Sequence, residues 1–299
     1  MSTTLPVPPW CARLVEDAAV FPPGLSPVDR AWLDHRALLD GAYAECVGPL
    51  LVAPAHAAEL ARVAAVGVPG APVQVVLIAR AETPARDVVP AITALAAIPD
   101  VTLTGLEIAH GHGWESGLQH NLPLAVEVSR VPDERDRALD EVASARGDGH
   151  AVIAKLRTQQ TAETPVPSAL DLAGFIAACR QHDLPFKLTG GVHHAIATTT
   201  STWNTSSTSA EPAAVREHGV VNVLLATHAA HTGASVNEIA RLLERTDSAP
   251  LAGQLSDLTP AQQHDLRSAF TSYGCCGVLD PLTELADLGL LAAPDPPDR

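Results

Sequence analysis

Lysine is rare in this chain of 299 residues, and its two lysines are the strongest candidates for chemistry. Nineteen residues are basic, but only Lys155 and Lys187 are lysine, and the others are arginine. Arginine carries the same charge, yet it cannot be deprotonated and therefore cannot become a nucleophile. Two neighbouring ammonium groups lower each other's pKa, and a neutral lysine amine can attack a carbonyl carbon to form a Schiff base. Both lysines are therefore candidate catalytic residues.

Other charged residues share the positions of the two lysines. Side chains on a β-strand alternate between its faces, and four expected strands carry apolar residues on one face and charge on the other. The charged positions are Glu107, Glu127, Lys155 with Arg157, and Lys187. Each lies late in its expected strand, which predicts that these side chains meet at the C-terminal mouth of a barrel. There Glu107 and Glu127 would transfer protons, and Arg157 would hold a carboxylate or phosphate of the substrate.

The elements that must position these residues alternate between strands and helices. The expected strands are Arg13–Asp17, Pro49–Ala53, Val73–Ala79, Val101–Ile108, Leu122–Ser129, His150–Arg157 and Pro185–Val192, with an eighth near Leu251–Leu255. Helical patterns cover Ala55–Val66, Asp87–Ala97, Pro132–Ala145, Ser168–Gln181, Glu211–His231, Ser235–Arg245 and Pro260–Ser272. Seven or eight such units predict an α/β fold of the (β/α)8, or TIM-like barrel, class. The glycine-rich motifs of nucleotide-binding sheets are absent.

One domain accounts for most of the chain. Residues 1–290 are expected to form the barrel and a C-terminal cap, and the proline-rich residues 291–299 are expected to be a disordered tail. The segment Thr198–Ser209 consists almost entirely of serine and threonine, which predicts a flexible insertion after the seventh strand. A lid over the active site and a merely tolerated surface loop are equally compatible with that composition.

Composition excludes several classes of function. The formal net charge of −15 disfavours binding to nucleic acid or to an anionic membrane surface, and no apolar run is long enough to cross a bilayer. The five cysteines have no CxxC spacing, and the N-terminus lacks the features of a secretion signal. We therefore expect a cytoplasmic protein with reduced thiols, no membrane partner and no nucleic-acid partner; homo-oligomerisation remains open.

Three segments resemble the Schiff-base aldolases of the deoxyribose-phosphate aldolase type. Lys155 lies late in the sixth strand, and the seventh reads FKLTGGVHH, with Lys187 ahead of Gly190 and Gly191 in a K-x-x-G-G-[IV] setting. The resemblance implies that Lys155 forms the imine, Lys187 perturbs its pKa, and Glu107 relays protons. The segment LRTQQ lacks the family's T-x-T-G phosphate contact, which argues against a sugar phosphate. The chain also resembles a group of uncharacterised bacterial proteins with an FK-x-T-x-G-x-HH strand, which implies no activity.

Glycines and histidines after the seventh strand complete the expected site. Gly190 and Gly191 would let an anionic ligand approach free backbone N–H groups. His193 and His194 are candidate substrate-binding residues; alternatively, they would support the lysines by hydrogen bonding. We therefore predict a lyase of the aldolase type that acts on a small carbonyl compound through Lys155, without a metal or another cofactor.

Two other functions remain open from the sequence. The first is a metal-dependent lyase or hydrolase whose ligands would be Glu107, Glu127, His110, His112 and His193, because carboxylates and imidazoles bind divalent metals. The second is a non-catalytic, ligand-binding barrel in which the buried charges form a salt-bridged plug.

Overall fold

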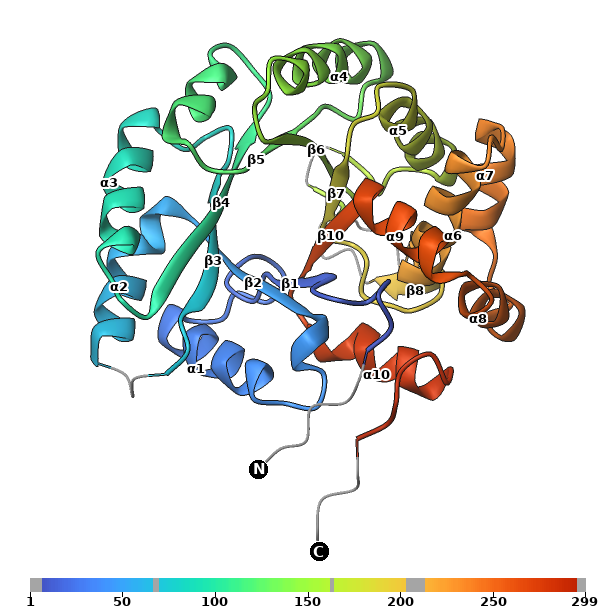
Figure 1. The fold of residues 1–299 in the computed structure, drawn as a ribbon, viewed down its shortest axis with the longest axis horizontal. Helices are drawn as coiled ribbons and strands as arrows, with labels where there is room; N and C mark the ends of the chain where they lie inside the picture. Colours follow the sequence, from blue (N-terminus) through green and yellow to red (C-terminus); the bar gives the residue numbers. More distant parts are fainter. Residues whose placement is uncertain (1–6, 67–69, 162–163, 203–212, 295–299) are drawn as a thin grey trace, which may run out of the picture.

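The computed structural model describes residues 7–66, 70–161, 164–202 and 213–294, and it contains a closed barrel of parallel strands (Figure 1). Around the barrel the strands follow in the order β1, β2, β3, β4, β5, β6, β7 and β10, and β10 closes the ring by pairing with β1. Their bounds are Val15–Asp17, Val47–Val52, Val73–Ala79, Val101–Ala109, Leu124–Glu127, Val152–Arg157, Phe186–Thr189 and Phe270–Cys275. The predicted TIM-like barrel is confirmed.

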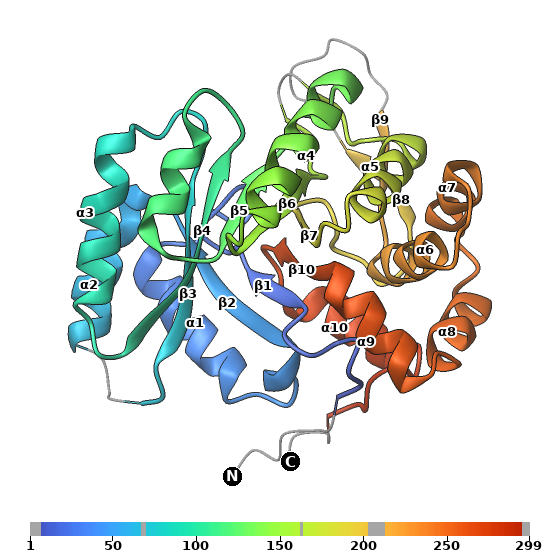
Figure 2. The same cartoon turned by 45° about the horizontal axis from the view of Figure 1, so that its top comes forward.

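Helices surround the barrel and cover the outer faces of its strands (Figures 1 and 2). They are α1 (Val28–Leu39), α2 (Ala57–Val66), α3 (Ala85–Ala96), α4 (Pro132–Gly147), α5 (Ala169–Gln181), α6 (Val220–His231), α7 (Val236–Glu244), α8 (Ser248–Ser256), α9 (Pro260–Ala269) and α10 (Leu279–Asp287). A short 3-10 helix, Trp114–His120, connects β4 to β5. Among the described residues, none of these helices has the length and apolar character that crossing a membrane requires.

Aromatic packing behind β7 and β10 fixes which side chains face the barrel axis. Phe186 of β7 packs against Phe175 of α5 and Phe270 of β10, with ring centroids 5.3 Å apart in both pairs. All three rings are buried. Because adjacent residues of a strand point in opposite directions, the outward position of Phe186 turns Lys187 inward, as the sequence predicts.

Helix α5 begins at the capping motif that its sequence indicates. The backbone N–H of Asp171 donates to the hydroxyl of Ser168 at 3.1 Å, and the N–H of Ser168 donates to the Asp171 carboxylate at 3.0 Å. These bonds satisfy backbone donors that the first turn of a helix leaves unpaired. The chain that leaves β6 is thereby held where α5 can pack against the barrel.

The eighth barrel strand lies elsewhere than predicted. Residues Leu251–Leu255 belong to α8, and the strand is Phe270–Cys275, part of which we expected to end a helix. A short apolar run fits a buried strand and a buried helical turn equally well, so periodicity alone misplaces it. The helix predicted over Pro260–Ser272 ends at Ala269, where Phe270 turns to an extended conformation.

The segment between β7 and α6 also differs from its prediction. Residues Thr198–Thr202 form strand β8, which pairs antiparallel with β9 (Ala213–Glu217), although we expected a flexible insertion and then a helix from Glu211. The rest of the serine- and threonine-rich segment, residues 203–209, lies outside the described residues. Only α6 of the expected helix remains, and it is buried on nearly every side because α5, α7, α8 and α9 surround it.

The C-terminal end of the chain is only partly described. Leu291, at the start of the expected disordered tail, is buried in the hydrophobic core, and residues 295–299 lie outside the described residues. The boundary between domain and tail therefore stays a prediction.

Candidate active site

Six charged side chains of alternating sign form a continuous chain of ion pairs inside the barrel. In the order of their contacts they are Glu16, Lys187, Glu107, Lys155, Glu127 and Arg157. Three carboxylates therefore balance three cations. Charges can be buried only when paired, so this alternation is what allows charged groups in the interior of the barrel.

Lys187 and Glu16 form the first part of the chain. The Lys187 ammonium donates to one oxygen of Glu16 and to one oxygen of Glu107, and Ser272 donates to the other Glu16 oxygen at 2.7 Å. Burial alone would lower the pKa of Lys187, but the two carboxylates raise it above its usual value. We expected the lysines to depress each other's pKa; for Lys187 that expectation is wrong, because it pairs with two carboxylates.

Glu107 links the two lysines. Its second oxygen lies 2.6 Å from the ammonium nitrogen of Lys155, and its side chain is 1% exposed. Burial alone would raise the pKa of this carboxyl group, but Lys155 and Lys187 lower it. Glu107 can contact both lysines because Lys155 and Lys187 are direct neighbours in the register of β6 and β7. The predicted gathering of Glu107 with both lysines is confirmed.

Glu127 and Arg157 complete the chain. Glu127 lies beside Lys155 in the register of β5 and β6, and the carboxylate is 2.8 Å from the Lys155 nitrogen. Arg157 donates two hydrogen bonds to the two Glu127 oxygens, at 2.8 and 3.2 Å. Burial would raise the pKa of Glu127, but Lys155 and Arg157 lower it to about 2. Because the guanidinium of Arg157 is already paired in this way, Arg157 is less available to an anionic substrate than we expected.

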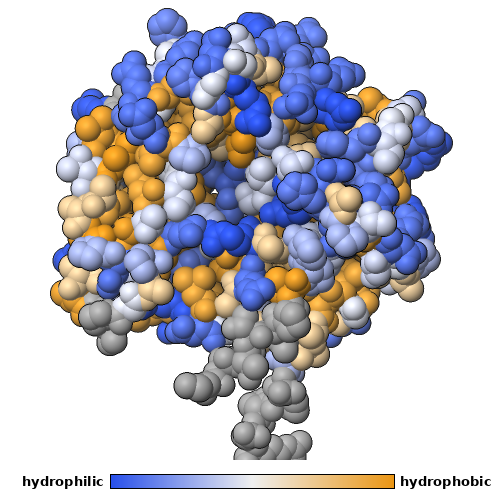
Figure 3. Space-filling model, viewed as in Figure 1, coloured by the Kyte–Doolittle hydropathy of each residue, from blue (hydrophilic) through white to orange (hydrophobic). Residues whose placement is uncertain are grey.

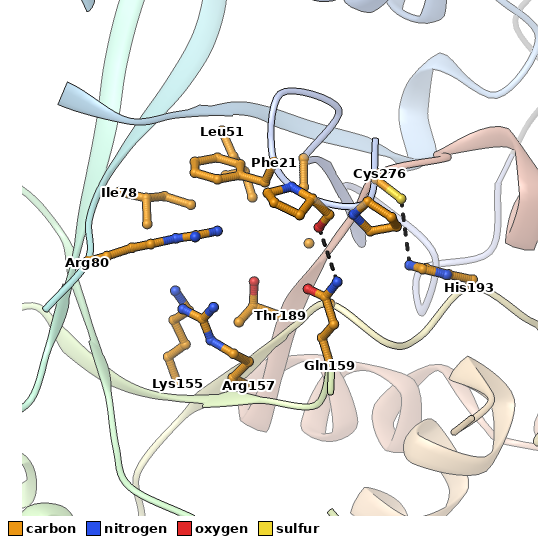
Figure 4. A pocket seen from close by; sticks show the side chains of 15 residues that line it. Phe21, Leu51, Ile78, Arg80, Lys155, Arg157, Gln159, Thr189, His193 and Cys276 are labelled. Carbon is orange, nitrogen blue, oxygen red and sulfur yellow. Dashed lines mark hydrogen bonds between the residues drawn. The ribbon is translucent and has the colours of Figure 1, made fainter. Parts of the chain in front are cut away.

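The chain of ion pairs separates two cavities, one at each mouth of the barrel. Lys155 and Arg157 line the cavity at the C-terminal mouth (Figure 4). Lys187, Glu107 and Glu16 line the cavity at the N-terminal mouth. Seen down the barrel, the surface is hollowed near its centre (Figure 3). We expected all the inward charges at the C-terminal mouth, and this is wrong for Lys187 and Glu107.

The cavity at the C-terminal mouth also contains residues that sequence reasoning missed. Arg80 directly follows β3 and lies over the ring of Phe21, 4.9 Å from the ring centroid. Burial and the neighbouring Arg157 lower the pKa of the Arg80 guanidinium. Cys276 follows β10 and lines the same cavity. Each of the two lies one residue beyond a strand, a position that would have indicated a residue at the mouth of the barrel. The strand before Cys276, however, was not predicted.

Glu16 was also missed by sequence reasoning, although it stands in the first expected strand. Its neighbour Asp17 serves the loop that follows β1. One Asp17 oxygen accepts the backbone N–H of Ala19 at 2.9 Å, and the other lies 3.0 Å from His35, which is buried. The residues Val15, Glu16 and Asp17 are all buried, so the alternation that identified the other charges gives no signal here.

The two glycines after β7 turn the chain. Gly190 and Gly191 have φ angles of +68° and +70°, a region that disfavours residues with a Cβ. A Cβ at Gly191 would lie 2.7 Å from the backbone oxygen of Thr158. The N–H of Gly190 is not free, since it donates to the oxygen of Gly274 at 3.1 Å. Gly190 nevertheless lines the cavity.

The two histidines after β7 occupy different surroundings. His193 lines the cavity at the C-terminal mouth, and its Nε2 lies 3.7 Å from the thiol of Cys276. His194 instead lies 2.7 Å from a carboxylate oxygen of Glu284 in α10. Neither histidine contacts a lysine among the described residues, so the predicted hydrogen-bonded support of the lysines is not found there.

The residues proposed for a metal site do not come together. His110 lies 2.9 Å from Glu141, and it lines a separate surface cavity together with His112. Within the described parts of the chain, no group of three histidine, cysteine or acidic side chains is arranged to hold a metal ion. The metal-dependent alternative draws its ligands from the barrel interior and from the separate surface cavity. This geometry therefore does not support it.

The arrangement can bind and react with a small molecule in one place. At the C-terminal mouth an amine, two guanidinium groups and an apolar wall share one cavity, with carboxylates behind the amine. Active sites of TIM barrels lie at this mouth. A comparison with protein-family models and with curated proteins found no significant match, so the function is inferred from this geometry.

Proposed function

We propose that this protein is a lyase of the aldolase type, in which Lys155 forms a Schiff base with a small carbonyl compound. The observation that carries the proposal is the position of the Lys155 amine. It lines the cavity at the C-terminal mouth, and it lies 2.6 and 2.8 Å from two carboxylates that can exchange protons with it. Lys187 lines the other cavity. Lys155 is thus the lysine that a substrate entering the C-terminal mouth would meet.

The first step requires Lys155 to lose a proton. The ammonium transfers it to Glu107 or Glu127, and the neutral amine then attacks the carbonyl carbon of the substrate. The resulting carbinolamine takes up the proton on its hydroxyl group and loses water, which leaves a protonated imine. Carboxylates that hold an ammonium also stabilise this product, because the iminium carries the same single positive charge at the same nitrogen. The pattern of alternating charges is therefore the same before and after the reaction.

Bond breaking then uses the iminium as an electron sink. In an aldol cleavage, a carboxylate removes the proton from the hydroxyl group on the β-carbon, and the electrons of the breaking C–C bond move into the imine to form an enamine. Glu127 fits this role better than Glu107, because its side chain is 19% exposed while that of Glu107 is 1% exposed. Protonation of the enamine and hydrolysis of the imine release the second product and restore Lys155.

Resemblance to the deoxyribose-phosphate aldolases adds support from the sequence. The residues matched to that family, on β4, β6 and β7, are those that contact one another in the chain of ion pairs. Lys187 would then be a positioning residue rather than a catalytic one. It holds Glu107, and Glu107 holds Lys155, so Lys187 acts on the imine-forming amine through the shared carboxylate.

A ligand-binding barrel without catalysis is the second candidate. It is favoured by the pairing of all six charges, since a fully paired set also describes a structural plug. The two candidates differ in one respect that can be measured. In a plug Lys155 forms no covalent bond, whereas in the lyase its amine bonds to a carbonyl compound that binds.

Borohydride trapping tests the proposal directly. The protein would be incubated with a panel of small aldehydes and ketones and reduced with borohydride, and the modified peptide would be identified by mass spectrometry. We expect a stable adduct on Lys155, with little on Lys187. The variant Lys155→Arg keeps the charge but has no reactive amine, so it should lose the adduct while its thermal unfolding stays close to that of the unmodified protein. Absence of an adduct on Lys155 with every compound in the panel would refute the lyase.

A further inference from the structure

Arg80 lines the cavity that contains Lys155, and among the described residues no carboxylate forms an ion pair with it. The ring of Phe21 lies under the guanidinium at 4.9 Å. The Arg80 side chain is partly buried, and burial and Arg157 lower the pKa of its guanidinium, although the more distant charges of Glu82 and Glu127 act in the opposite direction. Figure 4 shows the charged ends of Arg80, Arg157 and Lys155 pointing toward the same space. A cation in such a place is stabilised by an anion that enters the cavity.

The balance of charge at this mouth indicates how much negative charge is missing. The six ion-paired residues inside the barrel sum to zero, with three charges of each sign. Arg80 adds one positive charge to the wall of the cavity. Two further residues act on Arg80 or Arg157 from outside the cavity, Glu82 and Arg130, and they cancel each other. One negative charge from a ligand would therefore balance the charge of Arg80.

The shape and lining of the cavity favour a carboxylate as the source of that charge. The planar guanidinium of Arg80 can bind a carboxylate through two parallel hydrogen bonds. The wall beside Arg80 is apolar, with Phe21, Leu51 and Ile78, and it suits a short carbon skeleton (Figure 4). A phosphate monoester would bring close to two negative charges at neutral pH. The N–H of Gly190, a donor of the kind that phosphates often use, is already paired.

We infer that Arg80 binds the carboxylate of the substrate, and that the carbonyl compound attacked by Lys155 is therefore a small oxo acid. This inference rests on the proposed function, since it names the substrate class of the same site. Arg157 donates hydrogen bonds to both oxygens of Glu127. In this arrangement Arg157 orients the carboxylate of Glu127, which relays protons, and does not bind the substrate. When Arg80 binds the carboxylate of the oxo acid, the carbonyl carbon of the oxo acid faces the amine of Lys155.

Lactate binding tests the carboxylate site independently of imine chemistry. Lactate carries a carboxylate but no ketone or aldehyde, so it cannot form a Schiff base. Calorimetry would compare lactate binding to the unmodified protein, to Arg80→Gln and to Arg86→Gln. Arg86 is a matched control because it is an exposed arginine near the same mouth, at the start of α3. We expect Arg80→Gln to weaken lactate binding by about 10- to 100-fold and Arg86→Gln to leave it unchanged.

Trapping with a charged and a neutral ketone tests the substrate class. We expect the concentration of pyruvate that half-saturates borohydride trapping on Lys155 to be at least about tenfold lower than that of hydroxyacetone. Arg80→Gln should remove this difference by weakening pyruvate alone. Equal trapping of both ketones, with no effect of Arg80→Gln, would refute the carboxylate site and leave the lyase standing.

The remaining outcomes separate the two proposals. Lactate binding that depends on Arg80, together with no carbonyl adduct on Lys155, would support the carboxylate site and refute the lyase. Lactate binding that is absent, or unchanged in Arg80→Gln, would refute the carboxylate site. Inorganic phosphate that binds more tightly than lactate, and only when Arg80 is present, would refute the oxo acid and indicate a phosphorylated substrate.

Discussion

The two lysines of this barrel are neighbours in the backbone register of adjacent strands, but they line cavities at opposite mouths of the barrel. Lys155 and Lys187 stand side by side on β6 and β7, both are buried, and both contact the carboxylate of Glu107. Lys155 nevertheless lines the cavity at the C-terminal mouth, and Lys187 lines the one at the N-terminal mouth. A long, flexible lysine stem can place its ammonium well above or below its Cα, so two paired residues can serve opposite ends of a barrel.

The difference suggests a division of labour between the two halves of the barrel interior. The lower half, Glu16 and Lys187, lines the cavity at the N-terminal mouth, and its charges pair with each other, with Glu107 and with Ser272. The upper half, Lys155, Glu127 and Arg157, opens on a cavity that also contains the unpaired guanidinium of Arg80. We expect reactivity in the upper half and support in the lower half.

The largest effect is expected when the same substitution is made at each lysine. Lys155→Arg should lower the rate of borohydride-trapped adduct formation by about a thousandfold or more, because it removes the nucleophile. Lys187→Arg should lower that rate by less than about tenfold, since the charge next to Glu107 is retained. Peptide mass spectrometry after reduction measures both. Equal losses in the two variants would break the distinction between the lysines.

Removal of the shared carboxylate should destabilise the whole barrel. Glu107→Gln leaves both ammonium groups with one acceptor fewer in a buried place. We expect a loss of about 3–5 kcal/mol in the free energy of unfolding, as is typical when one partner of a buried ion pair is removed. Urea unfolding measures this, with Glu115→Gln on the exposed surface as a control. A loss below about 1 kcal/mol would show that Glu107 does not hold the two halves together.

Acid should weaken the upper half through Glu127. Its pKa is about 2 in the folded protein, against 4.5 for an unperturbed group, because Lys155 and Arg157 offset the effect of burial. A carboxyl group whose pKa is lower in the folded state stabilises the protein above its unfolded pKa. That contribution, about 3 kcal/mol, is lost as the pH falls from about 4.5 to about 2. Glu127→Gln should therefore be less stable at pH 6, and the difference should shrink toward pH 2.

Chemical denaturation at several pH values measures this dependence for both proteins. A gap in unfolding free energy that stays constant between pH 6 and pH 2 would show that Glu127 stabilises the fold by packing, and not through its charge.

The smallest effect is expected when the lower pair is replaced as a unit. The double variant Glu16→Leu with Lys187→Met removes one charge of each sign, and the remaining residues still alternate and sum to zero. Replacing a buried ion pair by apolar residues is often neutral or stabilising by about 1–4 kcal/mol. We expect thermal unfolding at the same or a higher temperature, with adduct formation on Lys155 retained. Complete loss of the adduct would show that the lower half takes part in the chemistry.

The sequence predicts the barrel and the inward charges because both depend on local periodicity. Alternation within strands placed Glu107, Glu127, Lys155 and Lys187 on the inner face, and the structure confirms that face. The mouth that each side chain reaches depends on the direction of its stem and on its partners, so the position of Lys187 could not be predicted. Its raised pKa follows from Glu107 and Glu16, and alternation within the short strand β1 does not reveal Glu16.

Cys276 and Arg80 could not be predicted as site residues, for different reasons. Strand β10 contains a serine and a glycine and follows a capped helix, so its pattern is weak, and Cys276 beyond it was not connected with the site. Arg80 stands one residue beyond a strand that was predicted correctly. What singles it out is that no carboxylate forms an ion pair with it among the described residues, which only the fold reveals.

A crystal structure of the protein soaked with pyruvate and reduced with borohydride would compare the two lysines most directly. We expect continuous density from the Lys155 nitrogen into the cavity at the C-terminal mouth, with the carboxylate of the adduct on Arg80 and Lys187 still bound to Glu16. Density that joins the ligand to Lys187 in the cavity at the N-terminal mouth, or an unmodified Lys155 with ligand beside it, would contradict the assignment of Lys155 as the reactive amine.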